Sequence, residues 1–158
     1  MNDVEAPFNY KYNEASHIWI DNNTITGGNG CRLYGNFGGS LSGNSFSDQR
    51  TNSASLFAWK NCTVNNNSFV NLGIDQDTVG INLLSYNGVG ATGNAISGNL
   101  CADNREAKYT AAAVVLSQGP HDRNIVTRNN ATGAKPGAKA VINLSSSANN
   151  IVAENIDD

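Results

Sequence analysis

The sequence predicts an all-β fold, a right-handed parallel β-helix solenoid of about six coils that carries an asparagine ladder. Three observations predict it. An asparagine-centred phrase occurs six times, a second phrase with two apolar residues precedes it, and the copies return at uneven intervals of 21 to 35 residues. A phrase that recurs in this way indicates stacked coils joined by loops of variable length.

The asparagine phrase is clearest at residues 62–69, where Asn67 stands between the apolar residues Val64 and Phe69. The asparagines of the six copies are Asn23, Asn44, Asn67, Asn94, Asn129 and Asn155. Asparagine tolerates the left-handed backbone conformation of a tight corner, and stacked amides can hydrogen-bond from coil to coil. We therefore expect this residue to turn each coil between its second and third strands and to build the ladder.

The second phrase is three residues long, with one apolar residue on each side of a central residue. This is strand spacing, because both apolar side chains then point to one side. The copies are residues 10–12, 31–33, 54–56, 81–83, 114–116 and 142–144. Each copy is predicted to form the first strand of a coil, so that every coil has three short strands.

The two phrases together resemble the pectin-lyase-like superfamily of parallel β-helices over about residues 8–157. Within that superfamily the chain is most similar to bacteriophage tailspike and tail appendage proteins. The resemblance implies a homotrimer of the virion tail, outside the host cell, that binds and as a hydrolase also cleaves a bacterial cell-surface polysaccharide. Tailspike hydrolases place Asp and Glu on the β-helix face or its loops, but no motif here assigns these roles residue by residue.

Composition restricts the function classes. The chain has 158 residues, a net charge of −3 and only 15% charged residues, so we expect one domain over residues 1–158 and no nucleic-acid partner. It contains no basic-then-apolar signal segment and no apolar run of membrane length, so neither a signal peptide nor membrane insertion is predicted. Both ends of the solenoid lack an obvious cap, which favours a segment of a longer protein.

Cysteine and histidine give no sign of a reactive centre. Cys31, Cys62 and Cys101 are odd in number and lack a CxxC spacing, which predicts no disulfide framework. His17 and His121 are isolated, with no serine or cysteine at triad spacing, and we expect both to be surface polar residues. No metal and no cofactor is expected.

The candidate substrate-binding residues point outward from the first strands. Strand alternation places Arg32, Tyr34, Phe57 and Asn82 on this face, and Trp59 continues the same alternation. Aromatic rings there can stack on sugars, and the polar groups can hydrogen-bond to hydroxyls. The alternative is that the aromatic side chains pack beneath the return loops that lead from one coil to the next.

The candidate catalytic residues lie in the return loops of the third and fourth coils, as Asp75 with Asp77 and Asp103 with Glu106. The loops leave adjacent coils at the same edge, so the two pairs are expected to approach each other. A glycoside hydrolase needs two carboxyl groups about 5–9 Å apart, one as acid and one as base or nucleophile. The alternative is that they are turn residues that accept backbone hydrogen bonds.

Two alternative functions differ in chemistry. A polysaccharide lyase or epimerase of the same superfamily would need a basic residue, such as Arg32, Lys60 or Arg105, beside a neutralising group. A purely structural trimeric β-helix shaft would need no site. Exposed aromatic residues favour a glycan-binding protein, clustered cations and acids favour the lyase, and a featureless surface favours the shaft. The sequence leaves open whether the chain is an enzyme.

Overall fold

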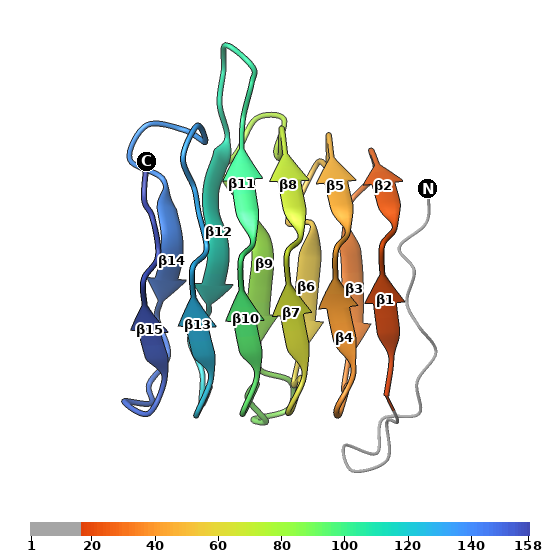
Figure 1. The fold of residues 1–158 in the computed structure, drawn as a ribbon, viewed down its shortest axis with the longest axis vertical. Helices are drawn as coiled ribbons and strands as arrows, with labels where there is room; N and C mark the ends of the chain where they lie inside the picture. Colours follow the sequence, from red (N-terminus) through yellow and green to blue (C-terminus); the bar gives the residue numbers. More distant parts are fainter. Residues whose placement is uncertain (1–16) are drawn as a thin grey trace.

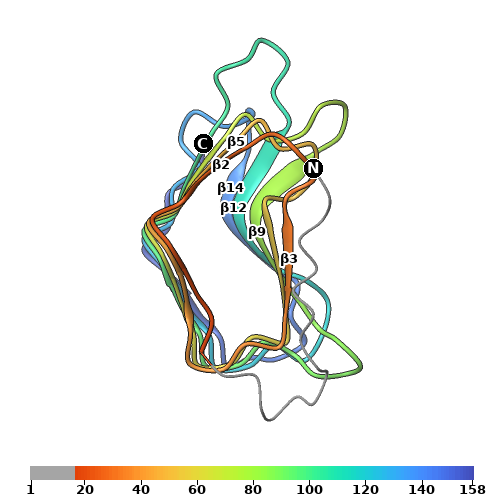
Figure 2. The same ribbon diagram turned by 90° about the vertical axis from the view of Figure 1, so that its right-hand side faces the viewer.

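The computed structural model describes residues 17–158 and is an all-β parallel β-helix of six coils (Figure 1). Strands of successive coils pair in parallel, and three sheets run along the stack. Figure 2 looks along the stack and shows the chain winding around these walls, with loops that protrude at the corners. The strand predicted at residues 10–12 lies outside the described residues. Within residues 17–158 no helix is long and apolar enough to cross a membrane.

Each sheet collects the equivalent strands of the coils. The first-strand sheet contains β3 (Cys31–Tyr34), β6 (Ala54–Phe57), β9 (Thr78–Leu84), β12 (Thr110–Leu116) and β14 (Lys139–Asn143). The second-strand sheet contains β1 (Trp19–Asp21), β4 (Ser40–Ser42), β7 (Thr63–Asn65), β10 (Ala95–Ser97), β13 (Ile125–Thr127) and β15 (Ile151–Ala153). The third-strand sheet contains β2 (Thr24–Thr26), β5 (Ser45–Ser47), β8 (Ser68–Val70) and β11 (Leu100–Ala102).

An asparagine ladder runs along the corner between the second and third strands, as predicted. Its members are Asn23, Asn44, Asn67, Asn99, Asn129 and Asn155. From Asn44 onward, each side-chain oxygen accepts hydrogen bonds from the backbone N–H and the side-chain amide of the ladder asparagine in the preceding coil. Asn67 Nδ2, for example, donates to Asn99 Oδ1 at 2.9 Å. The bonds satisfy amides that burial would otherwise leave without partners.

The fourth ladder residue is Asn99, and the prediction of Asn94 is wrong. Ile96 pairs with Val64, the residue before the corner, whereas the prediction had placed Ile96 after the corner. Asn94 belongs to a second ladder, at the corner between the first and second strands, where it accepts from the Cys62 N–H at 3.0 Å. This ladder continues through Asn124 and Asn150. Because two corners of the coil carry asparagine, the phrase alone could not separate them.

The left-handed residue of the predicted corner is the one before the ladder asparagine. The residues with positive φ there are Asn22, Gly43, Asn66, Gly98, Arg128 and Glu154. At two of these positions glycine also leaves room for the asparagine side chain of the preceding coil. A Cβ atom on Gly43 would collide with Asn22 Oδ1, and one on Gly98 would collide with Asn66 Oδ1. The ladder asparagine itself is selected for its amide, not for its backbone conformation.

The interior is filled by the inward residues of all three sheets. Leu33, Leu56, Leu83 and Leu116 form one stacked row of buried side chains. Phe46 and Phe69 stack at 5.1 Å in the wall formed by the third strands. This continuous core holds the outer faces and corners in place, since each coil is fixed by its two neighbours.

The register of β14, the C-terminal strand of the first-strand sheet, differs from the prediction by one residue. In the pairing of β14 with β12, Val141 lies beside Val114 and Asn143 beside Leu116. Leu144, predicted to point inward, is 54% exposed. Adjacent apolar residues at 141 and 142 fit either alternation, so the hydrogen-bonded pairing with β12 decides the register.

Candidate functional site

The outer face of the first-strand sheet is where the sequence predicts substrate binding, and it does bring Arg32 and Asn82 into one row. Ser55 pairs with both and lies between them. Arg32 is exposed and makes no ion pair within residues 17–158. Asn82 is half-buried, and its Oδ1 accepts a hydrogen bond from Ser117 Oγ at 2.6 Å. The row therefore offers a cation and an amide two coils apart.

An aromatic cluster lies beside this row. Tyr34 stacks on Phe57 with ring centroids 4.3 Å apart and an interplanar angle of 10°. Tyr86 meets Tyr34 edge-on at 5.3 Å, and all three side chains are half-buried. Tyr34 and Phe57 cover one face of each other's rings, and the three half-buried rings lie together along the stack. We refer to Tyr34, Phe57 and Tyr86 as the aromatic cluster.

Tyr86 was missed by the sequence reasoning although its position carries a signal. Tyr86 and Val89 exchange two backbone hydrogen bonds across Asn87 and Gly88, both of which have positive φ. An Asn-Gly pair in such a turn is typical of a two-residue hairpin, whose twist requires positive φ at both positions. The hairpin leaves the coil after β9 and sets Tyr86 against the rings of the two preceding coils.

Trp59 does not belong to this face, and the prediction of an exposed indole is wrong. Its side chain is 0% exposed and lies in the core, where Nε1 donates to Leu33 O at 3.2 Å. The cause is Ala58, which has a φ of 54°. A left-handed residue breaks strand alternation, so the next side chain turns inward. Gly35, at the same place in the preceding coil, has a φ of 57° and was the available signal.

Asp103 is locked into the base of the longest return loop. It is fully buried, and its carboxylate faces Arg105, with Nη2 to Oδ2 at 2.6 Å and Nε to Oδ1 at 2.8 Å. Burial alone would raise the pKa of Asp103, but hydrogen bonds from Arg105 and from the backbone N–H groups of Tyr109 and Thr110 outweigh it. They hold that pKa well below its usual range, so the group is unsuited to donate a proton near neutral pH.

Arg105 in turn fastens this loop to the coil before it. Its guanidinium donates to the carbonyl oxygens of Leu72 and Gly73 and lies over the ring of Tyr109 at 5.7 Å. These contacts tie the base of this return loop to the start of the return loop of the preceding coil. They also engage the Arg105 cation that a lyase would need.

The other predicted acids are exposed. Asp77 pairs with Lys135, with Nζ to Oδ2 at 2.6 Å, across two coils. Asp75 and Glu106 lie on the outside of their loops. The structure places the four acids on the return loops of neighbouring coils, and two of them are engaged by cations. The approach of the two pairs stays a prediction.

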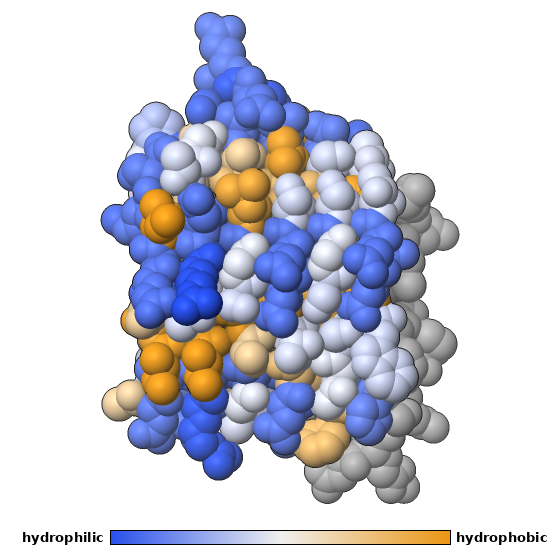
Figure 3. All heavy atoms as spheres, viewed as in Figure 1, coloured by the Kyte–Doolittle hydropathy of each residue, from blue (hydrophilic) through white to orange (hydrophobic). Residues whose placement is uncertain are grey.

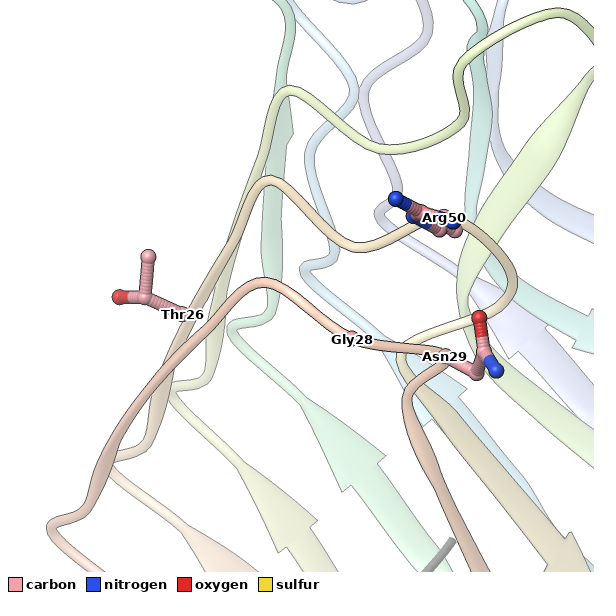
Figure 4. A pocket seen from close by; sticks show the side chains of 4 residues that line it. All are labelled: Thr26, Gly28, Asn29 and Arg50. Carbon is pink, nitrogen blue, oxygen red and sulfur yellow. The ribbon is translucent and has the colours of Figure 1, made fainter. Parts of the chain in front are cut away.

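A shallow pocket of about 290 Å³ lies between the first two described return loops. It is lined by Thr26, Gly28, Asn29 and Arg50. Figure 4 shows Thr26 on the opposite side of the turn from Asn29 and Arg50. Because its polar side chains diverge, this pocket cannot close on a ligand from several directions.

A larger pocket, of about 380 Å³, lies at the corner between the first and second strands. It contains Lys60, one of the cations that the lyase alternative considered, and also Arg123. It spans three successive coils, and the sequence could not have shown it because its residues lie far apart in the chain.

The cysteines belong to the packed interior, and Cys101 lies on β11 in the core. Cys62 and Cys101 are buried and Cys31 is half-buried, and all three are free thiols. Burial raises the pKa of Cys31 to about 11, which disfavours a nucleophilic thiolate. In the described part of the chain, no three His, Cys, Asp or Glu side chains are grouped to hold a metal ion.

Comparison with known proteins found no matching family model, curated protein or solved structure.

His121 is fully buried, and the prediction of a surface position is wrong. The Ala91 N–H donates to His121 Nδ1 at 3.0 Å, so the neutral ring carries its proton on Nε2. Nε2 is buried without a hydrogen-bond partner in the described structure. Burial lowers the pKa of His121, because the site cannot solvate an imidazolium.

Folding stability is therefore expected to fall as the pH drops below about 6.5, the ordinary histidine pKa. Unfolding exposes the ring, so the unfolded chain takes up the proton first, and stability rises with pH in this window. Thermal melts at pH 7.5 and pH 5.0 should show the loss in the wild type. His121→Asn should remove most of the difference, whereas His17→Asn, at an exposed position, should keep it.

The acids with shifted pKa values do not confuse this measurement. The pKa values of Asp103, Asp122 and Asp157 are all lowered from 3.8, so their protonation affects stability only in more acidic solution. An unchanged pH dependence in His121→Asn would show that another group controls it.

Proposed function

We propose that this β-helix binds a polysaccharide of the bacterial cell surface, as a phage tailspike does, along the outer face of its first-strand sheet. The observation that carries the proposal is the aromatic cluster, which stands half-exposed beside Arg32 and Asn82. Sugar C–H groups pack on apolar aromatic surface, and cation and amide donors suit sugar hydroxyls. In the proposed setting the chain lies on the virion tail, outside the cell.

The rigid support of this face favours recognition of an extended polymer. Tyr34 and Phe57 project from paired strands, and the row that contains Arg32 and Asn82 runs parallel to them along the stack. Binding groups on regular strands keep their spacing better than groups on loops. A linear polymer can therefore contact several coils at once without ordering the protein.

The proposal concerns binding and not cleavage. A hydrolase needs one carboxyl group that is protonated and one that acts as base or nucleophile. Asp103 is held ionised by Arg105, and Asp77 is paired with Lys135. Asp75 and Glu106 would have to supply both roles from exposed loop positions.

Binding of the wild type to purified bacterial surface polysaccharides, measured by calorimetry, tests the proposal. The double variant Tyr34→Ala/Tyr86→Ala should weaken binding at least tenfold, because it removes two of the three rings of the aromatic cluster. Trp19→Ala is the matched control, an exposed aromatic residue on another sheet, and should leave the affinity unchanged. Equal affinities in all three proteins would rule out this face, and no binding by the wild type would rule out the function.

A structural shaft is the second candidate, and one observation favours it. Figure 3 shows a mostly polar face over the second- and third-strand sheets, with apolar side chains gathered over the C-terminal strands. Ile125 and Ile151 are paired neighbours there and are 47% and 55% exposed. A homotrimer that buries these residues would explain them. Light scattering on the preparation used for calorimetry separates the candidates, since a trimer without glycan binding supports only the shaft.

A further inference from the structure

The larger pocket has a chemistry that the proposed function does not use. It is lined by Lys60, Asn61, Thr92, Gly93 and Arg123, and it has a volume of about 380 Å³. Lys60 and Thr92 are bridged in parallel, and so are Thr92 and Asp122, the neighbour of Arg123. The lining residues therefore come from the third, fourth and fifth coils and are held by the stacked backbone. The pocket volume lies within the size range of small-ligand sites.

The backbone of the pocket is already engaged, so recognition falls to its side chains. Asn61, Gly93 and Arg123 all have positive φ, between 51° and 69°. The N–H groups of Asn61 and Gly93 donate to the carbonyl oxygens of Thr92 and Asp122. A Cβ on Gly93 would contact Asn61 Oδ1, so glycine here leaves room for the Asn61 side chain.

The side chains of the pocket are mainly unengaged donors. Lys60, Asn61 and Thr92 make no side-chain hydrogen bond or ion pair within residues 17–158. Some surface cations are paired, as Arg128 is with Glu154 and Lys139 with Asp157, whereas Arg32 and Arg50, like Lys60, make no ion pair within residues 17–158. An ammonium group beside amide and hydroxyl donors, with no acid of its own, is suited to an oxyanion.

One acid stands near the pocket and is already occupied. Asp122 lies 3.2 Å from Arg123 Nε, and its Oδ1 accepts hydrogen bonds from Ser147 Oγ at 2.5 Å and Asn149 Nδ2 at 2.9 Å. Ser147 and Asn149 belong to the last coil, so these hydrogen bonds engage the Asp122 carboxylate from the side opposite to Lys60 along the stack. Two cations against one acid leave the pocket net positive in a chain whose net charge is −3.

We propose that this pocket binds an oxyanion group, a carboxylate or a phosphate, carried by a polysaccharide, with Lys60 and Arg123 as the charged contacts and Asn61 and Thr92 as hydrogen-bond donors. The polysaccharide part rests on the proposed function, whereas the anion part rests on the pocket alone. The proposal makes the preferred glycan an acidic one.

Calorimetry with defined probes tests it. The probes are an oligosaccharide that contains glucuronic acid, its methyl ester, glycerol phosphate and inorganic phosphate. We expect the acid to bind at least tenfold more tightly than the ester, and its affinity to fall as salt rises. Tight binding of glycerol phosphate in place of the glucuronate also supports the pocket and identifies phosphate as the group recognised.

Matched variants show whether the pocket is responsible. Lys60→Gln/Arg123→Asn should weaken binding of the acidic probe at least tenfold. Arg128→Asn is the control, because Arg128 is also a left-handed corner arginine of the fifth coil, with a φ of 56°, and should change the affinity less than twofold. Asparagine suits both positions since it tolerates positive φ. Thermal melts confirm that each variant is folded.

Several results would overturn the proposal. These are equal binding of acid and ester, full affinity in Lys60→Gln/Arg123→Asn, or inorganic phosphate bound as tightly as any sugar probe. The aromatic-cluster variant separates this failure from that of the proposed function. If Tyr34→Ala/Tyr86→Ala loses a neutral polysaccharide while the acid has no advantage, the function stands and the pocket proposal fails.

Discussion

Replacing Asn67 with leucine is expected to lower the free energy of unfolding by about 4 kcal/mol, since several buried polar groups lose their partners at about 1–3 kcal/mol each. Asn67 Oδ1 accepts from the N–H and Nδ2 of Asn44, at 3.0 Å each. Asn67 Nδ2 donates to Leu41 O at 2.8 Å and to Asn99 Oδ1 at 2.9 Å. Leucine is close to asparagine in size but offers no polar atom. Urea titration followed by circular dichroism measures the change.

The neighbouring residue provides the control. Asn66→Gly alters an exposed corner with a φ of 56°, where the equivalent residues Gly43 and Gly98 are already glycine. We expect a change within about 0.5 kcal/mol, as is usual for surface substitutions without a special role. If Asn67→Leu is as stable as the wild type, the ladder does not contribute to folding.

Most of the fold could be predicted because a solenoid repeats one set of physical requirements. The first strands at residues 31–33, 54–56, 81–83 and 114–116 lie where alternation placed them, since each must bury two side chains in the same core. Five of the six ladder asparagines were also identified. The sixth was missed because Asn94 and Asn99 both turn a corner of the fourth coil.

The corners account for the errors in the site. Alternation is reliable only while the backbone stays extended, and Ala58 leaves that region without glycine or asparagine to mark it. The burial of His121 and the pocket around Lys60 depend on which corners stack on one another. Which corners stack depends on the lengths of all the loops together, so no local sequence pattern predicts it. The aromatic pair Tyr34 and Phe57 was predictable because both lie on regular strands.

Replacing Trp59 with alanine is expected to lower the free energy of unfolding by about 3–5 kcal/mol, the usual cost of removing a large aromatic side chain from a core. Trp59 fills the interior beneath the corner of the third coil and satisfies the Leu33 carbonyl. Trp59→Phe should cost less, since it keeps much of the ring volume and loses the N–H donor. Urea titration of both variants by circular dichroism gives the comparison.

The chain contains only one other tryptophan, and it is the natural control. Trp19 is 65% exposed and stacks on His17 at 5.5 Å, so Trp19→Ala should change stability by less than about 1 kcal/mol. In Trp19→Ala the fluorescence comes from Trp59 alone and should resist quenching by acrylamide until the protein unfolds. A stable Trp59→Ala that loses polysaccharide binding would instead place the indole on the outer face, where strand alternation had predicted it, and would require Ala58 to be extended.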